Sequence, residues 1–162
     1  MLFGSNRPVT GKASTVIHRP VDEVFRFVGD DFLVNYPRWS PEVVDLRRLS
    51  EGPIRVGSLL RQVRIDHGHK SESSFRVTDY LPNRRLAFDG VSNAYRCIYD
   101  FEVFASHVDE GEATRLAFTF EFPELELILR PFEKLVRVAV QDGAERTVRN
   151  LKGLIEREAA RV

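Results

Sequence analysis

The hydrophobic and polar residues of this 162-residue chain follow two periods, and the changes between them divide the sequence into three parts. Residues 12–19 read as a short strand that ends at Pro20, and apolar positions in residues 20–32 recur at helical spacing. Proline suits the first turn of a helix, because the amide hydrogen that it lacks has no partner there. We therefore expect a strand and then a helix, preceded by a loose lead-in over residues 1–11.

The stretch VNYPRWSPEV (34–43) contains the single tryptophan of the chain, Trp39, between Pro37 and Pro41. Proline disrupts the interior of a helix and of a central strand, so we expect neither element to continue through this stretch, which would join a second short helix to the sheet. Trp39 either forms a wall at the entrance of a pocket, where it offers apolar area and one donor, or pins the helices to the sheet as a core residue. Both interpretations predict that Trp39 is mostly buried.

From Val43 onward the period of the pattern changes to two, which is typical of strands. Turn-forming stretches such as DHGH and PN separate the alternating segments. Because these connections are short, we expect antiparallel neighbours in a meander. The six predicted strands cover residues 43–49, 58–65, 70–81, 84–91, 94–105 and 112–123.

The last third of the chain returns to helical spacing, with one broad apolar face over about residues 131–161. This pattern predicts one long amphipathic helix, and residues 124–130 before it form either an extra turn or coil. Gly143 and Gly153 interrupt the helix, and each costs about 1 kcal/mol relative to alanine. Gly143 either leaves room for a ligand, allows a bend, or packs closely on the sheet.

The pattern as a whole predicts a single α+β domain over residues 1–162, in which a curved antiparallel sheet wraps around the C-terminal helix. Alternation gives this sheet an unusually aromatic inner face. A buried phenol needs a hydrogen-bond partner, so we expect Tyr95 or Tyr99 to point its hydroxyl into a polar-lined cavity. The candidate pocket-lining residues are Tyr36, Trp39, Phe75, Phe88, Tyr95, Tyr99, Phe101, Phe118, Phe120, Val140 and Ala144.

The alternating pattern does not determine which side chains of residues 58–65 face inward, because Leu59 and Leu60 are adjacent and both apolar. Either Arg61 faces inward, or Gln62 and Arg64 do. An unpaired buried charge is strongly unfavourable, so an inward arginine requires a carboxylate partner or an anionic ligand, whereas an outward arginine is simply solvated. The candidate polar anchors for a ligand are Arg61, Arg64, Tyr95 and Tyr99.

Composition and charge limit the kinds of molecule and the compartments in which we expect the protein to act. Lys plus Arg and Asp plus Glu both number 24, and this balance argues against a nucleic-acid partner, which usually requires a basic surplus. The single cysteine excludes an intrachain disulfide and suits a reducing compartment. The N-terminal residues lack the apolar core of a signal peptide, and no run approaches the roughly 20 apolar residues of a membrane-spanning helix. We expect a cytoplasmic protein without integral membrane association; the sequence permits a homo-oligomer but does not indicate one.

Signatures of metal binding and catalysis are weak. His67 and His69 lie two residues apart, but Gly68 between them marks a hairpin turn and a third strong ligand is missing. Cys97 falls on the inner face without a nearby histidine or cation to activate its thiol, which favours packing. The chain has no glycine-rich phosphate loop and no nucleophile elbow. We therefore predict no metal and no cofactor, and leave open whether the protein is an enzyme.

Fragments from about Ala13 to Glu156 resemble the START-like (SRPBCC) superfamily of helix-grip proteins, specifically its polyketide cyclase/dehydrase branch. They are VIHRPVDEVFRFV, PRWSPEVVDLRRL, EGPIRVGS, VTDYLPNRRLAF, ATRLAFTFEF and VRNLKGLIE. This resemblance implies two short helices after the first strand and a deep cavity between the sheet and the C-terminal helix. It does not imply a reaction, because the superfamily has no universal catalytic motif to carry over.

The expected function is therefore the binding of a hydrophobic or amphipathic small molecule, of lipid, quinone or polyketide type, in that cavity. The alternative is a polyketide cyclase, aromatase or dehydratase that acts in the same cavity. A third class is a protein-interaction module whose cavity has collapsed.

Overall fold

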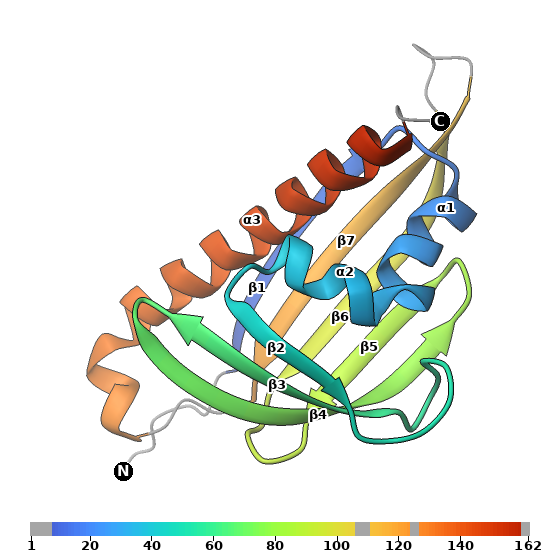
Figure 1. Cartoon of the computed structure of the whole chain (residues 1–162). Coiled ribbons are helices and arrows are strands. Elements are labelled where there is room, and N and C mark those ends of the chain that lie inside the picture. The colour runs from blue at the N-terminus through green and yellow to red at the C-terminus, as the bar shows by residue number, and fades with distance from the viewer. Residues whose placement is uncertain (1–7, 106–110, 124–126, 160–162) are drawn as a thin grey trace.

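Seven antiparallel strands form one curved sheet, and the helices lie on its concave side (Figure 1). The computed structural model describes residues 8–105, 111–123 and 127–159. The elements in chain order are β1 (Val9–Ile17), α1 (Val21–Phe25), a π-helical turn (Arg26–Asp30), α2 (Phe32–Trp39), β2 (Val43–Arg48), β3 (Leu59–Asp66), β4 (His69–Leu81), β5 (Arg85–Gly90), β6 (Arg96–Ala105), β7 (Glu112–Phe122), a 3-10 helix (Leu127–Phe132) and α3 (Glu133–Ala159).

The strand order is β1-β7-β6-β5-β4-β3-β2, so β2 to β7 are successive neighbours and β1 closes the sheet beside β7. This order confirms the predicted six-strand meander, and each strand begins and ends within two residues of the predicted bounds. It also confirms the predicted α+β fold with two short helices after the first strand and one long C-terminal helix. Among the described residues, no helix is both long and apolar enough to cross a membrane.

The start of the first strand differs from the prediction. β1 begins at Val9 and ends at Ile17, so residues 9–11 are not part of a loose lead-in, while residues 1–7 lie outside the described residues. The pattern was missed because Gly11 occupies an inward position where an apolar side chain would have marked the strand. A side chain is excluded there: a Cβ on Gly11 would lie 2.6 Å from the backbone oxygen of Val140 in α3.

The prediction that Pro37 excludes a helix was also wrong. Pro37 lies inside α2, and Trp39 is the last residue of that helix. The proline removes only the hydrogen bond that its own nitrogen would donate, and the next turn continues, since the nitrogen of Ser40 donates to the oxygen of Tyr36 at 2.9 Å. Pro41 follows the helix, as expected.

The long C-terminal helix is present as α3, which begins at Glu133, two residues after the predicted start, and is described to Ala159. The ambiguous segment before it forms a 3-10 helix from Leu127 to Phe132, and residues 124–126 lie outside the described residues. α3 runs along the sheet edge formed by β1 and β7 (Figure 1).

Polar side chains of α3 bond to the open edge of β1. The side-chain amide of Gln141 donates to the oxygen of Lys12 at 2.8 Å and accepts from its nitrogen at 3.0 Å. The carboxylate of Glu156 accepts from the nitrogen of His18 at 2.9 Å. An open sheet edge carries unpaired backbone groups, and these contacts satisfy some of them while fixing α3 beside the sheet.

Most of the hydrophobic core lies between the two short helices and the sheet. Rings from α2 pack against rings from β4, β5 and β6, with centroids 5.7 to 6.3 Å apart. The central aromatic residues are Phe32, Tyr36, Trp39, Phe75, Phe88 and Tyr99, all at most 6% exposed. One end of the inner face is therefore filled by protein side chains.

Candidate functional site

A polar cluster lies on the inner face of β3, beside the aromatic core. Leu60 and Gln62 are buried on this face, at 0% and 3% exposure, and Arg64 follows two residues later. Arg61 lies on the other face, where its guanidinium pairs with Glu72 at 2.6 Å. Of the two orientations left open by the sequence, the structure therefore has Gln62 and Arg64 inward, and Arg61 is not an anchor on the inner face.

Gln62 lies at the centre of the cluster. Its amide oxygen accepts from the hydroxyl of Tyr36 at 3.2 Å. Its amide nitrogen lies 3.2 Å from the hydroxyl of Tyr95 and 3.2 Å from that of Ser73, the residue opposite Gln62 on β4. Two phenols and one alcohol thus converge on a single buried amide.

Arg64 is paired within the protein. Its guanidinium donates to both carboxylate oxygens of Asp66 at 3.1 Å and to the hydroxyl of Ser40 at 3.3 Å. Burial alone lowers the pKa of Arg64, but its hydrogen bonds to Asp66 and the nearby negative charges outweigh burial, so the pKa is raised overall. Arg64 therefore stays protonated, and the carboxylate of Asp66 balances its charge through two hydrogen bonds.

The phenols and the thiol of the cluster are uncharged at neutral pH. Burial raises the pKa of Tyr95 to about 12, although its hydrogen bonds to Ser73 and Gln62 oppose that rise. Burial likewise raises the pKa of Tyr36, Tyr99 and Cys97. The cluster offers a ligand neutral hydrogen-bonding groups rather than net charge, and the Cys97 thiol is not activated as a nucleophile.

One flank of α3 carries half-buried residues on the side of the helix that is turned toward α2 and β2. Residues on this flank share a face at helical spacing and are half-buried, namely Val136, Val140, Gly143 and Thr147. The flank is turned toward α2 and β2, since the side-chain amide of Asn150 donates to the oxygen of Trp39 at 3.0 Å and Arg146 pairs with Glu42 at 3.7 Å. The other flank carries Gln141, which bonds to β1.

The predicted pocket-lining residues fall into two groups. The first group is at most 6% exposed and packs in the core: Tyr36, Trp39, Phe75, Phe88, Tyr99, Phe101, Phe118 and Ala144. The second group is half-buried and comprises Tyr95 at the polar cluster, Phe120 on β7 and Val140 on α3. The rings of Tyr95 and Phe120 stack with centroids 5.9 Å apart.

Trp39 is 1% exposed, which confirms its predicted burial. Its ring packs edge-on against Phe32, and its indole nitrogen donates to the hydroxyl of Tyr99 at 3.3 Å. These contacts place Trp39 among core residues that join α2 to the sheet. Neither Tyr95 nor Tyr99 has a hydroxyl in bulk solvent, and only Tyr95 brings its hydroxyl to the polar cluster.

His67 and Gly68 form the turn between β3 and β4, with positive φ angles of 50° and 79°, and His69 begins β4. Such angles are typical of a tight two-residue turn. Among the residues described here, no group of three or more His, Cys, Asp or Glu side chains is arranged to hold a metal ion.

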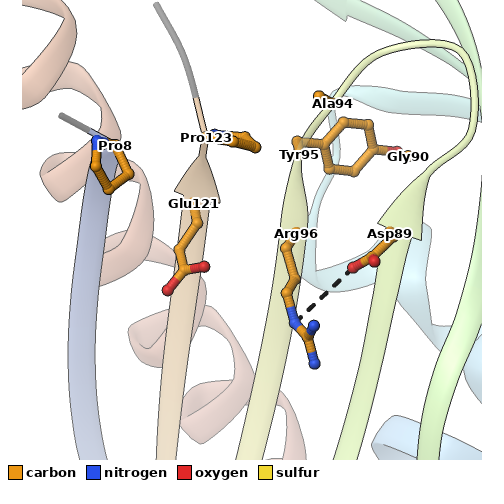
Figure 2. A pocket seen from close by; sticks show the side chains of 8 residues that line it. All are labelled: Pro8, Asp89, Gly90, Ala94, Tyr95, Arg96, Glu121 and Pro123. Atoms are coloured by element: carbon orange, nitrogen blue, oxygen red, sulfur yellow. Dashed lines mark ion pairs between the residues drawn. The ribbon is translucent and has the colours of Figure 1, made fainter. Parts of the chain in front are cut away.

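A separate hollow of about 440 Å³ opens at the end of the sheet, on the face turned away from α3 (Figure 2). Arg96 lies at its floor, 3.8 Å from Asp89 and opposite Glu121 on β7. Its lining consists of Pro8, Asp89, Gly90, Ala94, Tyr95, Arg96, Glu121 and Pro123. Only Tyr95 is shared with the predicted lining set.

Sequence reasoning missed several members of the inner site. Ser73 could have been found from its parity with Phe75, and Asp66 from its parity with Arg64. Val136 and Thr147 lie one turn before Val140 and one turn after Gly143 on α3. These positions were passed over because small polar residues and half-buried valines carry no distinctive chemistry of their own.

Comparison with known proteins finds one matching family. The sequence profile of the family described as polyketide cyclase / dehydrase and lipid transport matches residues 8–156. No curated protein matches the sequence.

Solved structures share the fold at low sequence identity. The Zhui aromatase/cyclase from Streptomyces sp. R1128 superposes with a TM-score of 0.73 at 18% identity, over 94% of this chain and 96% of its own. The protein TTHA0849 from Thermus thermophilus gives a TM-score of 0.69 at 20% identity, over 94% and 99%. The Polyketide_cyc-like protein Cgl2372 from Corynebacterium glutamicum gives 0.63 at 20% identity, over 96% of each chain.

Proposed function

Because the chain belongs to the polyketide cyclase/dehydrase and lipid transport family, we propose that it binds a hydrophobic or amphipathic small molecule between the sheet and α3. The ligand is of lipid, quinone or polyketide type. A cytoplasmic location, favoured by the single cysteine, is part of this proposal.

The observation that carries the proposal is the convergence of Tyr36, Ser73 and Tyr95 on the buried amide of Gln62. A few convergent polar groups within an apolar surface are typical of small-molecule sites. Tyr95 is half-buried rather than sealed in the core, so its hydroxyl can exchange Gln62 for a ligand. The half-buried Phe120 and Val140 supply apolar surface for the body of the ligand.

The polar end of the ligand is uncharged in this account. Arg64 already holds Asp66 through two hydrogen bonds, and an anionic ligand would have to displace that carboxylate. A carbonyl or hydroxyl group needs no such exchange, because it can accept from a neutral phenol or amide. Quinones, ketones and fatty alcohols fit this requirement better than phosphorylated lipids do.

Native mass spectrometry of the freshly purified protein, followed by denaturation to release bound compounds, tests the proposal. We expect a defined extra mass, or uptake of the neutral fluorophore N-phenyl-1-naphthylamine (NPN). Tyr95→Phe should weaken NPN binding about fivefold to tenfold, the equivalent of one net hydrogen bond. Tyr80→Phe is the matched control, because the hydroxyl of Tyr80 donates to Asp30 instead. A bare chain that also fails to bind NPN would contradict the proposal and favour a protein-interaction module.

A cyclase, aromatase or dehydratase acting in the same cavity is the second candidate. It is favoured by the phenols of the cluster lying near the Arg64 guanidinium, since such groups can hold and move protons on a reactive carbonyl chain. The similarity to the fold of the Zhui aromatase/cyclase points the same way. Loss of turnover of a polyketide-like substrate in Tyr95→Phe, with binding retained, would identify catalysis, whereas Tyr99→Phe should leave turnover unchanged because Tyr99 is enclosed in the core.

A further inference from the structure

The exposed surface of α3 changes character along the helix. A helix on a protein surface normally turns polar residues outward, and the longer, C-terminal part of α3 does so. Every exposed side chain between residues 142 and 158 is charged, namely Asp142, Glu145, Arg146, Arg149, Arg157 and Glu158. Over residues 133–141, by contrast, three of the four exposed side chains are apolar: Leu135, Val138 and Ala139. The first turns of α3 therefore depart from the pattern that the rest of the same helix follows.

These apolar residues form one ridge together with Phe132, which ends the 3-10 helix one turn before Leu135. On an α-helix, Leu135, Val138 and Ala139 fall within an arc of about 100° around the axis. Phe132, Leu135 and Val138 are 54%, 68% and 59% exposed. Large apolar side chains that gather on a surface mark a contact with a partner. We call these four residues the apolar ridge.

Basic residues accompany the apolar ridge. Arg130, Lys134 and Arg137 lie in the same segment, and Glu133 is the only carboxylate in residues 130–138. Glu133 pairs with Arg137 at 3.4 Å, so it does not offset the charge of Lys134, which is exposed one turn before Val138. The chain as a whole has no net charge, so the positive excess belongs to this end of the helix. Apolar residues on one face with Lys and Arg beside them are typical of helices that lie in the headgroup region of a membrane.

We propose that the 3-10 helix and the first turns of α3 dock on the surface of a membrane that contains anionic lipids. Figure 1 shows this end of α3 at the margin of the molecule, away from α1 and α2. The apolar ridge enters the interfacial region, and the ammonium group of Lys134 lies among the anionic headgroups. Docking requires no bound ligand, so the inference goes beyond the proposed function and does not depend on it.

A second copy of the chain fits this surface less well than an anionic membrane does. Most homodimers have twofold symmetry, which places the same patch of each subunit against the other. The basic residues around Lys134 would then face their own copies, and juxtaposed like charges oppose association. An anionic lipid surface turns the same charges into an attraction.

Co-sedimentation with large unilamellar vesicles tests the inference. One preparation contains phosphatidylcholine alone, and the other contains phosphatidylcholine and phosphatidylglycerol in about equal parts. We expect the protein to bind the anionic vesicles at least about tenfold more tightly than the neutral ones. Raising the NaCl concentration from about 0.1 M to about 1 M should remove most of this difference, because salt screens the attraction.

Two valines with the same exposure provide a matched pair of variants. Val138 and Val103 are both 59% exposed, but Val103 lies opposite Thr114 at the far end of the sheet, where β7 pairs with the end of β1 at Ile17. Val138→Gln should weaken binding to the anionic vesicles about threefold to tenfold, and Val103→Gln should change it less than about twofold. Lys134→Gln should weaken it about fivefold, the equivalent of one cation near the surface.

The substituted side chains are exposed, so the variants should fold and unfold as the wild type does, which circular dichroism checks. Equal binding to neutral and anionic vesicles, or binding to neither, would overturn the inference. Equal effects of Val138→Gln and Val103→Gln would show that the apolar ridge is not the contact surface. A wild-type dimer in analytical ultracentrifugation that Leu135→Gln dissociates would assign the ridge to a second copy of the chain and would also refute membrane docking.

Discussion

Trp39 and Tyr99 connect the helical layer to the sheet through a single hydrogen bond and a shared ring contact. The indole nitrogen lies 3.3 Å from the phenol oxygen, and the ring centroids are 5.9 Å apart. Both side chains are 1% exposed. At the scale of single residues, the lone tryptophan is therefore a structural element of the core, and the residues that we propose to face a ligand lie further along the inner face.

Trp39→Phe should lower the free energy of unfolding by about 2 kcal/mol, because it leaves a space in the core and removes the partner of the Tyr99 hydroxyl. Urea denaturation followed by circular dichroism measures this change. Tyr99→Phe removes the same hydrogen bond with almost no loss of volume and should cost about 1 kcal/mol. If Trp39→Phe were no more destabilising than Tyr99→Phe, the packing role of the indole would be refuted.

At the scale of elements, α3 is held to the edge of β1 by side-chain contacts with the backbone. Glu156 takes part in one of them, since its carboxylate accepts from the nitrogen of His18 at 2.9 Å. The same carboxylate also accepts from the ammonium of Lys152, within α3, at 3.0 Å. Burial raises the pKa of Glu156, but these hydrogen bonds and the charge of Lys152 lower it overall, below its ordinary value of 4.5.

A lowered pKa in the folded state means that this contribution to stability is present above pH 4.5 and is lost as the pH falls through the folded value. Glu156→Gln should therefore lower the free energy of unfolding by about 1 kcal/mol at pH 7, and the difference from wild type should shrink below pH 4.5. Denaturation curves at several pH values measure it. Glu133→Gln, at the other end of α3, should change little. A difference that is independent of pH would show that the carboxylate charge is not responsible.

The elements that the sequence predicts well are those with uninterrupted periodicity. Strands β2 to β7 and α3 follow from alternation and helical spacing, whereas the start of β1 was hidden by Gly11 and the end of α2 by Pro37. The candidate site was predictable only in part. Parity placed Tyr95 on the inner face, but the convergence on Gln62 depends on the register of β3 against β4, which no local pattern encodes.

At the scale of the whole molecule, the inner surface has two ends of different character. Toward α1 and α2, aromatic rings fill the interior and are at most 6% exposed. Toward the N-terminal half of α3, the apolar residues Val136 and Val140 are only half-buried, and polar side chains are hydrogen-bonded around Gln62 on β3. The hollow beside Arg96 lies on the opposite face of the sheet (Figure 2) and plays no part in the proposed binding. The central claim is that a small molecule occupies the space between the sheet and α3.

Titration of the ¹⁵N-labelled protein with the neutral probe NPN, followed by nuclear magnetic resonance, tests this claim most directly. We predict that the largest shifts occur at the amides of Gln62, Tyr95 and Val140, while the indole resonance of Trp39 changes little because its ring is enclosed by the core. Largest shifts at Asp89 and Glu121 would place the ligand in the outer hollow instead. Either that result or the absence of saturable shifts would contradict the account.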